Sequence, residues 1–141
     1  MVANDDLSAS GSVNVFGGDD AMGIHVHREG PVTVVAVSGD VDLLTADHLR
    51  DTLAAEVAVR PGVLVVDLDS VEFLSSTGLA ALALAHRAAV AAGVALRIVA
   101  TSRVTLRPLQ VTSMTEELFV FGSRADALAP ESGTARSLRI G

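Results

Sequence analysis

The sequence predicts one α/β domain with a largely parallel sheet, an N-terminal β-hairpin at the sheet edge and three to four helices, in the order ββαβαβαβα. Hydrophobic residues make up 50% of the 141 residues and aromatic residues only 3%, so aliphatic side chains must form the core. Short β-branched stretches alternate with stretches whose apolar residues recur every three or four positions. Strand–helix–strand units of this kind cross over right-handedly and form parallel sheets.

The predicted hairpin opens the domain. Residues 24–27, Ile-His-Val-His, alternate apolar and polar side chains, as expected of an edge strand with one solvated face. Residues 28–31, Arg-Glu-Gly-Pro, have the composition of a turn, and residues 32–37 form a second apolar strand. We therefore expect the two strands to pair as a hairpin.

The first helix is predicted over residues 45–59, with Thr45 as its N-cap. Its apolar residues recur on one face: Ala46, Leu49, Leu53 and Val57. Its charged residues are expected elsewhere on the helix: Asp47, Arg50, Asp51 and Glu56.

Residues 63–68, Val-Leu-Val-Val-Asp-Leu, form an almost unbroken aliphatic run, which is typical of a central strand covered on both faces. Asp67 in this run is expected to have a structural role, bonded to the backbone of the loop that follows. The remaining predicted elements follow in order: helix 76–92, strand 95–99, helix 102–111 with Ser102 as its cap, strand 118–121 and a helical turn at 124–128. Pro108 weakens the third helix, because proline is well tolerated only in a first helical turn.

The domain is predicted to cover residues 22–129, between two flexible tails at residues 1–21 and 130–141. Both tails are rich in small and polar residues and lack sustained periodicity. The N-terminal tail is acidic, with four aspartates and no arginine or lysine.

Composition excludes several functions. The net charge is −7, all ten basic residues are arginines, and the chain lacks tyrosine and tryptophan, so we expect no binding to nucleic acid. The absence of lysine and cysteine excludes a Walker A lysine, a Schiff-base lysine and a thiolate nucleophile, and fits a cytoplasmic protein. The longest apolar stretch, 78–96, is interrupted by His86 and Arg87 and predicts no membrane span.

The histidines do not predict an enzyme or a metal site. His25 and His27 share a strand face about 6–7 Å apart, but no third ligand is evidently placed to complete a site. His86 lies nine positions after Thr77 on the same helix, roughly 13 Å away, too far for a nucleophile–base pair. We expect no catalytic residue, metal or cofactor.

Ligand and partner sites in parallel sheets gather at the carboxyl ends of the strands. Three loops are expected there, at residues 39–42, 69–78 and 100–103. The middle loop ends in Ser75-Ser76-Thr77-Gly78 at the start of a helix, where unpaired backbone N–H groups and partial positive charge favour an anion. Gly78 is expected to keep the backbone accessible.

Residues 66–79, Val-Asp-Leu-Asp-Ser-Val-Glu-Phe-Leu-Ser-Ser-Thr-Gly-Leu, resemble the signature of STAS domains, specifically of bacterial anti-sigma factor antagonists. Residues 39–42, Gly-Asp-Val-Asp, resemble the family's Gly-Glu-Leu-Asp loop, and residues 102–119 resemble its third helix and last strand. The resemblance covers residues 22–128 and implies a STAS-like version of the predicted fold.

The resemblance implies a phosphorylation site at the last hydroxyl before Gly-Leu, which is Thr77, with Ser76 as second choice. Ser75 stands where the family has an acid. The implied partner-binding residues are Asp42, Leu43, Leu74, Ser75, Ser76, Thr77, Gly78, Ser102 and Arg103. The apolar Leu44 beside Leu43 belongs to the same expected surface, but for at least one of these leucines ordinary packing under the loop is the favoured alternative. Asp42 alone fits a docking contact and a solvated acid before the helix equally well.

The resemblance further implies a partner: an anti-sigma factor with a serine/threonine kinase fold, which itself binds ATP. The unmodified antagonist would sequester this partner and free a sigma factor, and phosphorylation would end the binding. Two alternatives stay open: a non-switching STAS adaptor in a signalling or transport complex, favoured by Ser75, and a small-ligand sensor. The sequence does not predict the oligomeric state.

Overall fold

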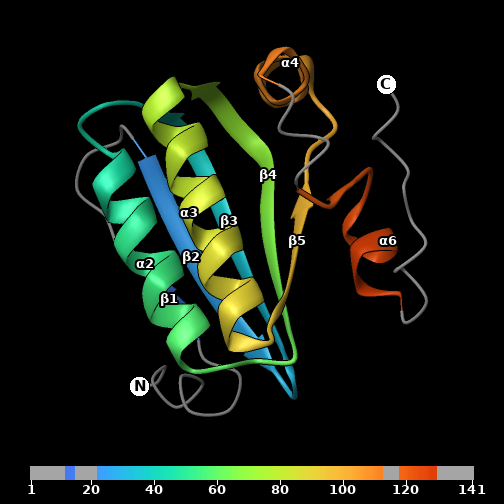
Figure 1. The fold of residues 1–141 in the computed structure, drawn as a ribbon. Helices are drawn as coiled ribbons and strands as arrows, with labels where there is room; N and C mark the ends of the chain where they lie inside the picture. The colour runs from blue at the N-terminus through green and yellow to red at the C-terminus, as the bar shows by residue number, and fades with distance from the viewer. Residues whose placement is uncertain (1–11, 15–21, 113–117, 130–141) are drawn as a thin grey trace.

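A six-stranded mixed sheet forms the centre of the computed structural model, which describes residues 12–14, 22–112 and 118–129 (Figure 1). The strands lie side by side in chain order, from β1 to β6. The elements are β1 (Ser12–Asn14), β2 (Met22–Glu29), β3 (Val32–Val41), α2 (Ala46–Ala58), β4 (Val63–Leu74), α3 (Ser76–Ala92), β5 (Ala95–Val99), α4 (Arg103–Val111), β6 (Val120–Phe121) and α6 (Arg124–Leu128).

The sheet confirms the predicted fold class. β2 and β3 pair antiparallel as the expected hairpin, and β3, β4, β5 and β6 follow as parallel neighbours. Figure 1 shows α2 and α3 together on one side of the sheet, with α6 on the other side. The carboxyl ends of the parallel strands therefore meet at the edge where α2, α3 and α4 begin.

The first strand differs from the prediction. Ser12–Asn14 was assigned to the N-terminal tail, but it pairs antiparallel with His25–His27 as β1. At these residues β1, and not β2, forms the sheet edge. Three residues that include serine and asparagine give too short and too weak a β pattern to be recognised. The remainder of the predicted tails, 1–11, 15–21 and 130–141, lies outside the described residues.

Strands β3 and β4 are longer than predicted. The expected loops at 39–42 and 69–78 are strand up to Val41 and Leu74, and the two strands stay paired through two register shifts. Residues 69–74 include aspartate, serine and glutamate, which are weak strand formers, so the sequence reads as a loop. Pairing with the end of β3 overrides that local preference.

The core has two parts, one on each face of the sheet. The larger part fills the space between the sheet and the helices α2 and α3, and contains Leu49, Leu53, Leu64, Val66 and Leu82. The smaller part lies under α6 and contains Val34, Val65, Val99, Phe121 and Ala127. β4 is thus covered on both faces, as its aliphatic run predicts.

Glu56 of α2 is buried, although it was expected with the other charged residues of the helix. Two nitrogens of Arg28 in β2 donate to its carboxylate. Nη2 lies 2.9 Å from Oε1 and 2.7 Å from Oε2, and Nε lies 3.2 Å from Oε1. Paired, hydrogen-bonded charges of this kind offset the cost of desolvating the carboxylate.

Candidate functional site

The turn between β4 and α3 contains the predicted phosphorylation site. Ser75 is the N-cap of α3: its backbone is extended and its Oγ accepts a hydrogen bond from the Gly78 N–H at 3.2 Å. The Ser75 N–H donates to the carbonyl of Val41 at 2.9 Å. The start of the helix is therefore bonded directly to the end of the neighbouring strand β3.

The three hydroxyls of this turn have different surroundings. The Oγ of Ser75 and the Oγ1 of Thr77 form a hydrogen bond of 2.7 Å, and Thr77 is half-buried. Ser76 is exposed at the first helical position. The bond to Ser75 fixes the direction of the Thr77 hydroxyl, whereas exposure makes Ser76 the easier hydroxyl to reach.

Gly78 has a packing role that the sequence analysis missed. It is buried, and a Cβ at this position would lie 2.6 Å from Cγ1 of Val41 and 2.8 Å from Cδ1 of Leu74. The expectation that Gly78 leaves the backbone accessible was therefore wrong. Its small size instead lets the first turn of α3 pack against the ends of β3 and β4.

Asp42 organises the turn before α2. Its Oδ1 accepts hydrogen bonds from the N–H groups of Leu44 at 3.0 Å and Thr45 at 3.1 Å. Thr45 occupies the predicted N-cap position, but its side chain donates to the Asp40 carbonyl and makes no cap bond to the helix. Asp42 was interpreted as either a docking contact or a solvated acid before the helix, and these bonds give it a structural role that neither interpretation included.

This turn places two leucines in solvent. Leu43 is 73% exposed and Leu44 is 82% exposed, so neither packs under the loop. Leu74 is only 5% exposed and belongs to the core, so its predicted place on the surface was wrong. The neighbouring Phe73, 51% exposed, was missed. The alternation of a strand over 69–74 would have given Phe73 and Leu74 opposite faces.

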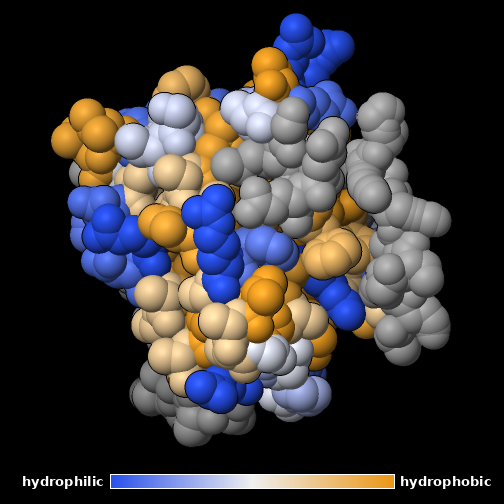
Figure 2. All heavy atoms as spheres, in the orientation of Figure 1, coloured by the Kyte–Doolittle hydropathy of each residue, from blue (hydrophilic) through white to orange (hydrophobic). Residues whose placement is uncertain are grey.

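A groove of about 220 Å³ runs between the first turns of α2 and α3. Its lining residues are Leu43, Ala46, Asp47, Arg50, Thr77, Ala80, Ala81 and Leu84. In Figure 2, hydrophilic atoms over the upper half of α2 lie beside paler and hydrophobic atoms over α3, and hydrophobic atoms protrude above the start of α2. The groove thus joins Thr77 to exposed apolar surface and to a pair of charges.

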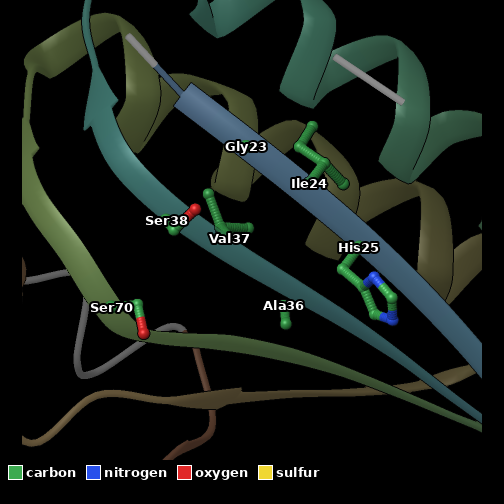
Figure 3. A pocket seen from close by; sticks show the side chains of 7 residues that line it. All are labelled: Gly23, Ile24, His25, Ala36, Val37, Ser38 and Ser70. Atoms are coloured by element: carbon green, nitrogen blue, oxygen red, sulfur yellow. The ribbon is translucent and has the colours of Figure 1, made fainter. Parts of the chain in front are cut away.

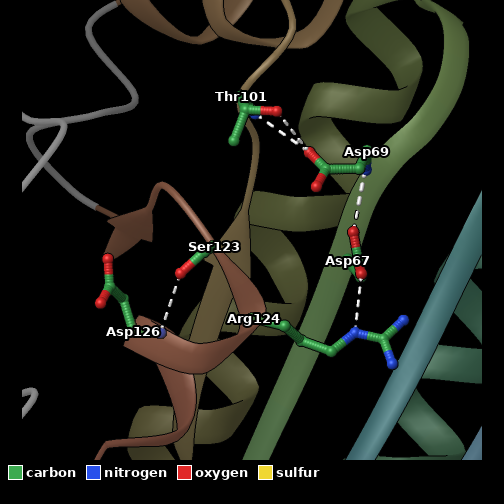
Figure 4. Close-up of polar contacts among 6 residues, drawn as sticks. All are labelled: Asp67, Asp69, Thr101, Ser123, Arg124 and Asp126. Atoms are coloured by element: carbon green, nitrogen blue, oxygen red, sulfur yellow. Dashed lines mark hydrogen bonds and ion pairs between the residues drawn. The ribbon is translucent and has the colours of Figure 1, made fainter.

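The third predicted loop lies at the same sheet edge, between β5 and α4. Ser102 is the N-cap residue of α4 as predicted, although its side chain makes no cap bond, and Arg103 is exposed. α4 accommodates Pro108 within its nine residues. The backbone N–H and the hydroxyl of Thr101 donate to Oδ1 of Asp69 at 3.1 and 2.9 Å, which ties this loop to β4 (Figure 4).

Asp67 has the structural role expected of it. Its Oδ1 accepts a hydrogen bond from the Asp69 N–H at 2.9 Å, and its Oδ2 pairs with Nε of Arg124 at 2.8 Å. Figure 4 shows this chain of contacts running from α6 across β4 to the loop at Thr101. The contacts attach α6 and the loop at Thr101 to β4.

The opposite face of the sheet carries a second hollow, of about 250 Å³, lined in part by His25, Ser38 and Ser70 (Figure 3). Nε2 of His27 lies 3.5 Å from Oε1 of Glu29. Among the residues that the structure describes, no three histidine or acidic side chains are grouped so as to hold a metal ion. In the same part of the chain, no helix is long and apolar enough to span a membrane.

The fold and the turn together define a class of protein: a small α/β domain with a hydroxyl-bearing helix start at the carboxyl edge of its sheet. A family model described as "STAS domain" matches residues 24–127, and the chain belongs to this family.

Two relatives from two strains of Mycobacterium tuberculosis share the name anti-sigma-F factor antagonist RsfB. Each is 34% identical over 114 residues, which are 81% of this chain and 93% of the relative. A crystal structure of an anti-sigma factor antagonist from Mycobacterium paratuberculosis is 32% identical, with a TM-score of 0.71 over 80% of this chain and 96% of that one. The anti-sigma factor antagonist SpoIIAA in its unphosphorylated form shares the fold, with a TM-score of 0.65 at 12% identity over 78% of this chain and 96% of that one.

Proposed function

We propose that this protein is a cytoplasmic anti-sigma factor antagonist. It binds an anti-sigma factor with a serine/threonine kinase fold and so frees a sigma factor. One observation carries the proposal: in a STAS domain, Thr77 lines a groove that is also lined by the exposed Leu43, next to Leu44. The names of relatives at 32–34% identity support the same function.

The proposed switch is phosphorylation of Thr77 by the bound partner. The γ-phosphoryl group of ATP on the partner would pass to Oγ1 of Thr77, the bond to the β–γ bridging oxygen would break, ADP would leave, and the hydroxyl proton would go to a base of the partner. Thr77 is preferred to Ser76 because it lines the groove, where a phosphate acts directly on a docked partner. Ser76, which is exposed, is the second candidate.

The added charge supplies the reason why binding would end. A phosphothreonine carries about −1.5 to −2 charges at neutral pH. The phosphate would add to the net charge of −7 that the chain already has. It would also have to lose its water under a partner docked on the groove, which is costly. The partner is therefore released, while the backbone N–H groups at the start of α3 stabilise the phosphate in the free domain.

The test uses the full chain with its native partner. After incubation with ATP and magnesium, mass spectrometry should place one phosphate on Thr77, and the complex should dissociate. Thr77→Ala should bind the partner without being switched off, and Thr77→Glu should lose at least about tenfold in affinity, or about 1.4 kcal/mol. The matched control is Ser70→Glu, which adds the same charge at an exposed residue in the hollow on the other face of the sheet.

A second candidate function is a non-switching STAS adaptor. The observation that favours it is the neutral N-cap: Ser75 replaces the family's acid and holds the Thr77 hydroxyl in a hydrogen bond. An adaptor would form a stable complex that ATP leaves unchanged. Equal binding by Thr77→Glu, Thr77→Ala and the parent would decide for the adaptor and against the switch.

A further inference from the structure

We infer that Arg50 of α2 receives the phosphate on Thr77, and that this contact closes the groove between α2 and α3 to the partner. The inference rests on the proposed phosphorylation of Thr77 and adds the side chain that binds the phosphate. Arg50 is the one basic side chain among the described residues that line the groove.

The two helices bring Arg50 and Thr77 to the same groove. α2 and α3 lie side by side and begin at the same end of the sheet (Figure 1). Thr77 is in the first turn of α3, and Arg50 is in the second turn of α2. Helical side chains lean toward the N-terminus of their helix, so the Arg50 side chain leans toward the level of Thr77. Its contact with Asp47, one turn back, follows that direction.

The present partners of Arg50 are easily exchanged. Its Nη1 lies 3.2 Å from Oδ1 of Asp47, and its Nη2 lies 3.2 Å from Oδ1 of Asp51. Both carboxylates are exposed, and ion pairs of exposed side chains contribute little to stability. A phosphate offers a higher charge and oxygens spaced for both arms of a guanidinium, which makes it the stronger partner.

Three other arginines of the described residues are engaged away from the groove. Arg28 binds Glu56, Arg97 binds the carbonyl of Ala127, and Arg124 binds Asp67. Asp47 is the opposing charge, because it lines the groove beside Arg50 and repels a phosphate. The structure therefore gives a test in both directions: removing Arg50 should weaken the contact, and neutralising Asp47 should strengthen it.

The consequence for the partner is steric as well as electrostatic. A guanidinium drawn across the groove to the phosphate would cover two small residues of α3 that line it, Ala80 and Ala81. A glutamate at position 77 has a smaller charge and lacks the tetrahedral phosphate oxygens. We therefore expect Thr77→Glu to reproduce the switch only in part.

The experiment installs phosphothreonine at position 77 of the full chain during translation, so that no kinase is needed. The second pKa of the phosphate is then measured by phosphorus NMR as the pH is varied. In the parent, Arg50 should hold this pKa below the usual value of about 6. Arg50→Gln should raise the pKa by roughly half a unit or more, and Asp47→Asn should lower it further.

Arg60→Gln is the matched control, because Arg60 follows the far end of α2; it should leave the phosphate pKa unchanged. Circular dichroism and thermal unfolding of each variant show that the fold is intact. An identical pKa in the parent and in Arg50→Gln would overturn the inference, even if phosphorylation still released the partner. Conversely, a shifted pKa in a chain that no kinase modifies would uphold the Arg50 contact and refute the proposed switch.

Discussion

Gly78 shows at the scale of one residue why a short turn tolerates little change. Its missing Cβ leaves room for Val41 and Leu74, so the first turn of α3 can pack on the ends of two strands. Neighbouring Ser75 supplies the only side chain that caps this helix in the described structure. The glycine and the serine thus serve the fold, and the Ser75 side chain also bonds the hydroxyl of Thr77.

Gly78→Ala should lower the free energy of unfolding by about 1–3 kcal/mol, because the new methyl group overlaps Val41 and Leu74. Urea denaturation followed by circular dichroism measures the change. Gly122→Ala is the control, since a Cβ there meets no atom within 4 Å. Equal stability of the Gly78 variant and the parent would show that the turn can shift away from β3.

The surroundings of some single residues could be predicted from the sequence, and those of others could not. Asp67 was correctly expected to bond the following backbone, although it lies inside β4 and its second partner, Arg124, was not foreseen. Leu74 and Phe73 were placed wrongly, since their faces depend on whether residues 69–74 form a strand. That decision depends on the pairing with β3, which no local pattern contains.

At the scale of elements, the aliphatic runs and helical periods were sufficient to predict the long helices and the order of β2 to β6, but not β1 or the full length of β3 and β4. Val63–Leu68 predicts a strand covered on both faces, and α3 begins and ends at the predicted residues. The burial of Glu56 in α2 could not be predicted, because it depends on Arg28 of β2, 28 positions earlier in the chain. Local periodicity carries no information about such a partner.

The pair gives a prediction for α2. Glu56→Gln should lose about 1–3 kcal/mol of unfolding free energy, because the half-exposed guanidinium of Arg28 loses its counter-charge and the buried position 56 loses a charge-assisted hydrogen bond. Asp51→Asn, an exposed change on the same helix, should stay within about 0.5 kcal/mol of the parent. Denaturant titrations of both variants in parallel make the comparison. A loss no larger than that of Asp51→Asn would mean that the pair adds nothing to the attachment of α2.

At the scale of the whole molecule, the topology gathers three loops at one edge of the sheet. Their convergence was predicted from the order of strands and helices, because parallel strands end on the same side. The groove between α2 and α3 was not predicted. It arises from the packing of two helices, with Ala80 and Leu84 exposed toward Arg50 of the other helix.

Replacing Leu43 and Leu44 together by serine should weaken binding of the partner by at least about tenfold, or about 1.4 kcal/mol, while unfolding changes little, because both side chains already lie in solvent. Calorimetric titration with the isolated partner measures the loss. The control is Val90→Ser, an exposed apolar residue in the last turns of α3, far from the Thr77 turn. If Val90→Ser weakened binding as much as the leucine change, the docking surface would have to be moved along α3.

The bond from the Ser75 N–H to the Val41 carbonyl, together with the packing of Gly78 on Val41, joins the turn before α3 to the strand that leads into the 42–45 turn. Two of the three loops at this edge therefore form one rigid block. A partner that binds these joined loops has less backbone to order, although the exposed side chains of Leu43 and Leu44 still lose freedom. Variants at this edge should then alter the lifetime of the complex far more than its rate of formation, which we expect in the range of about 10⁵–10⁷ M⁻¹s⁻¹ that is usual for preshaped protein pairs.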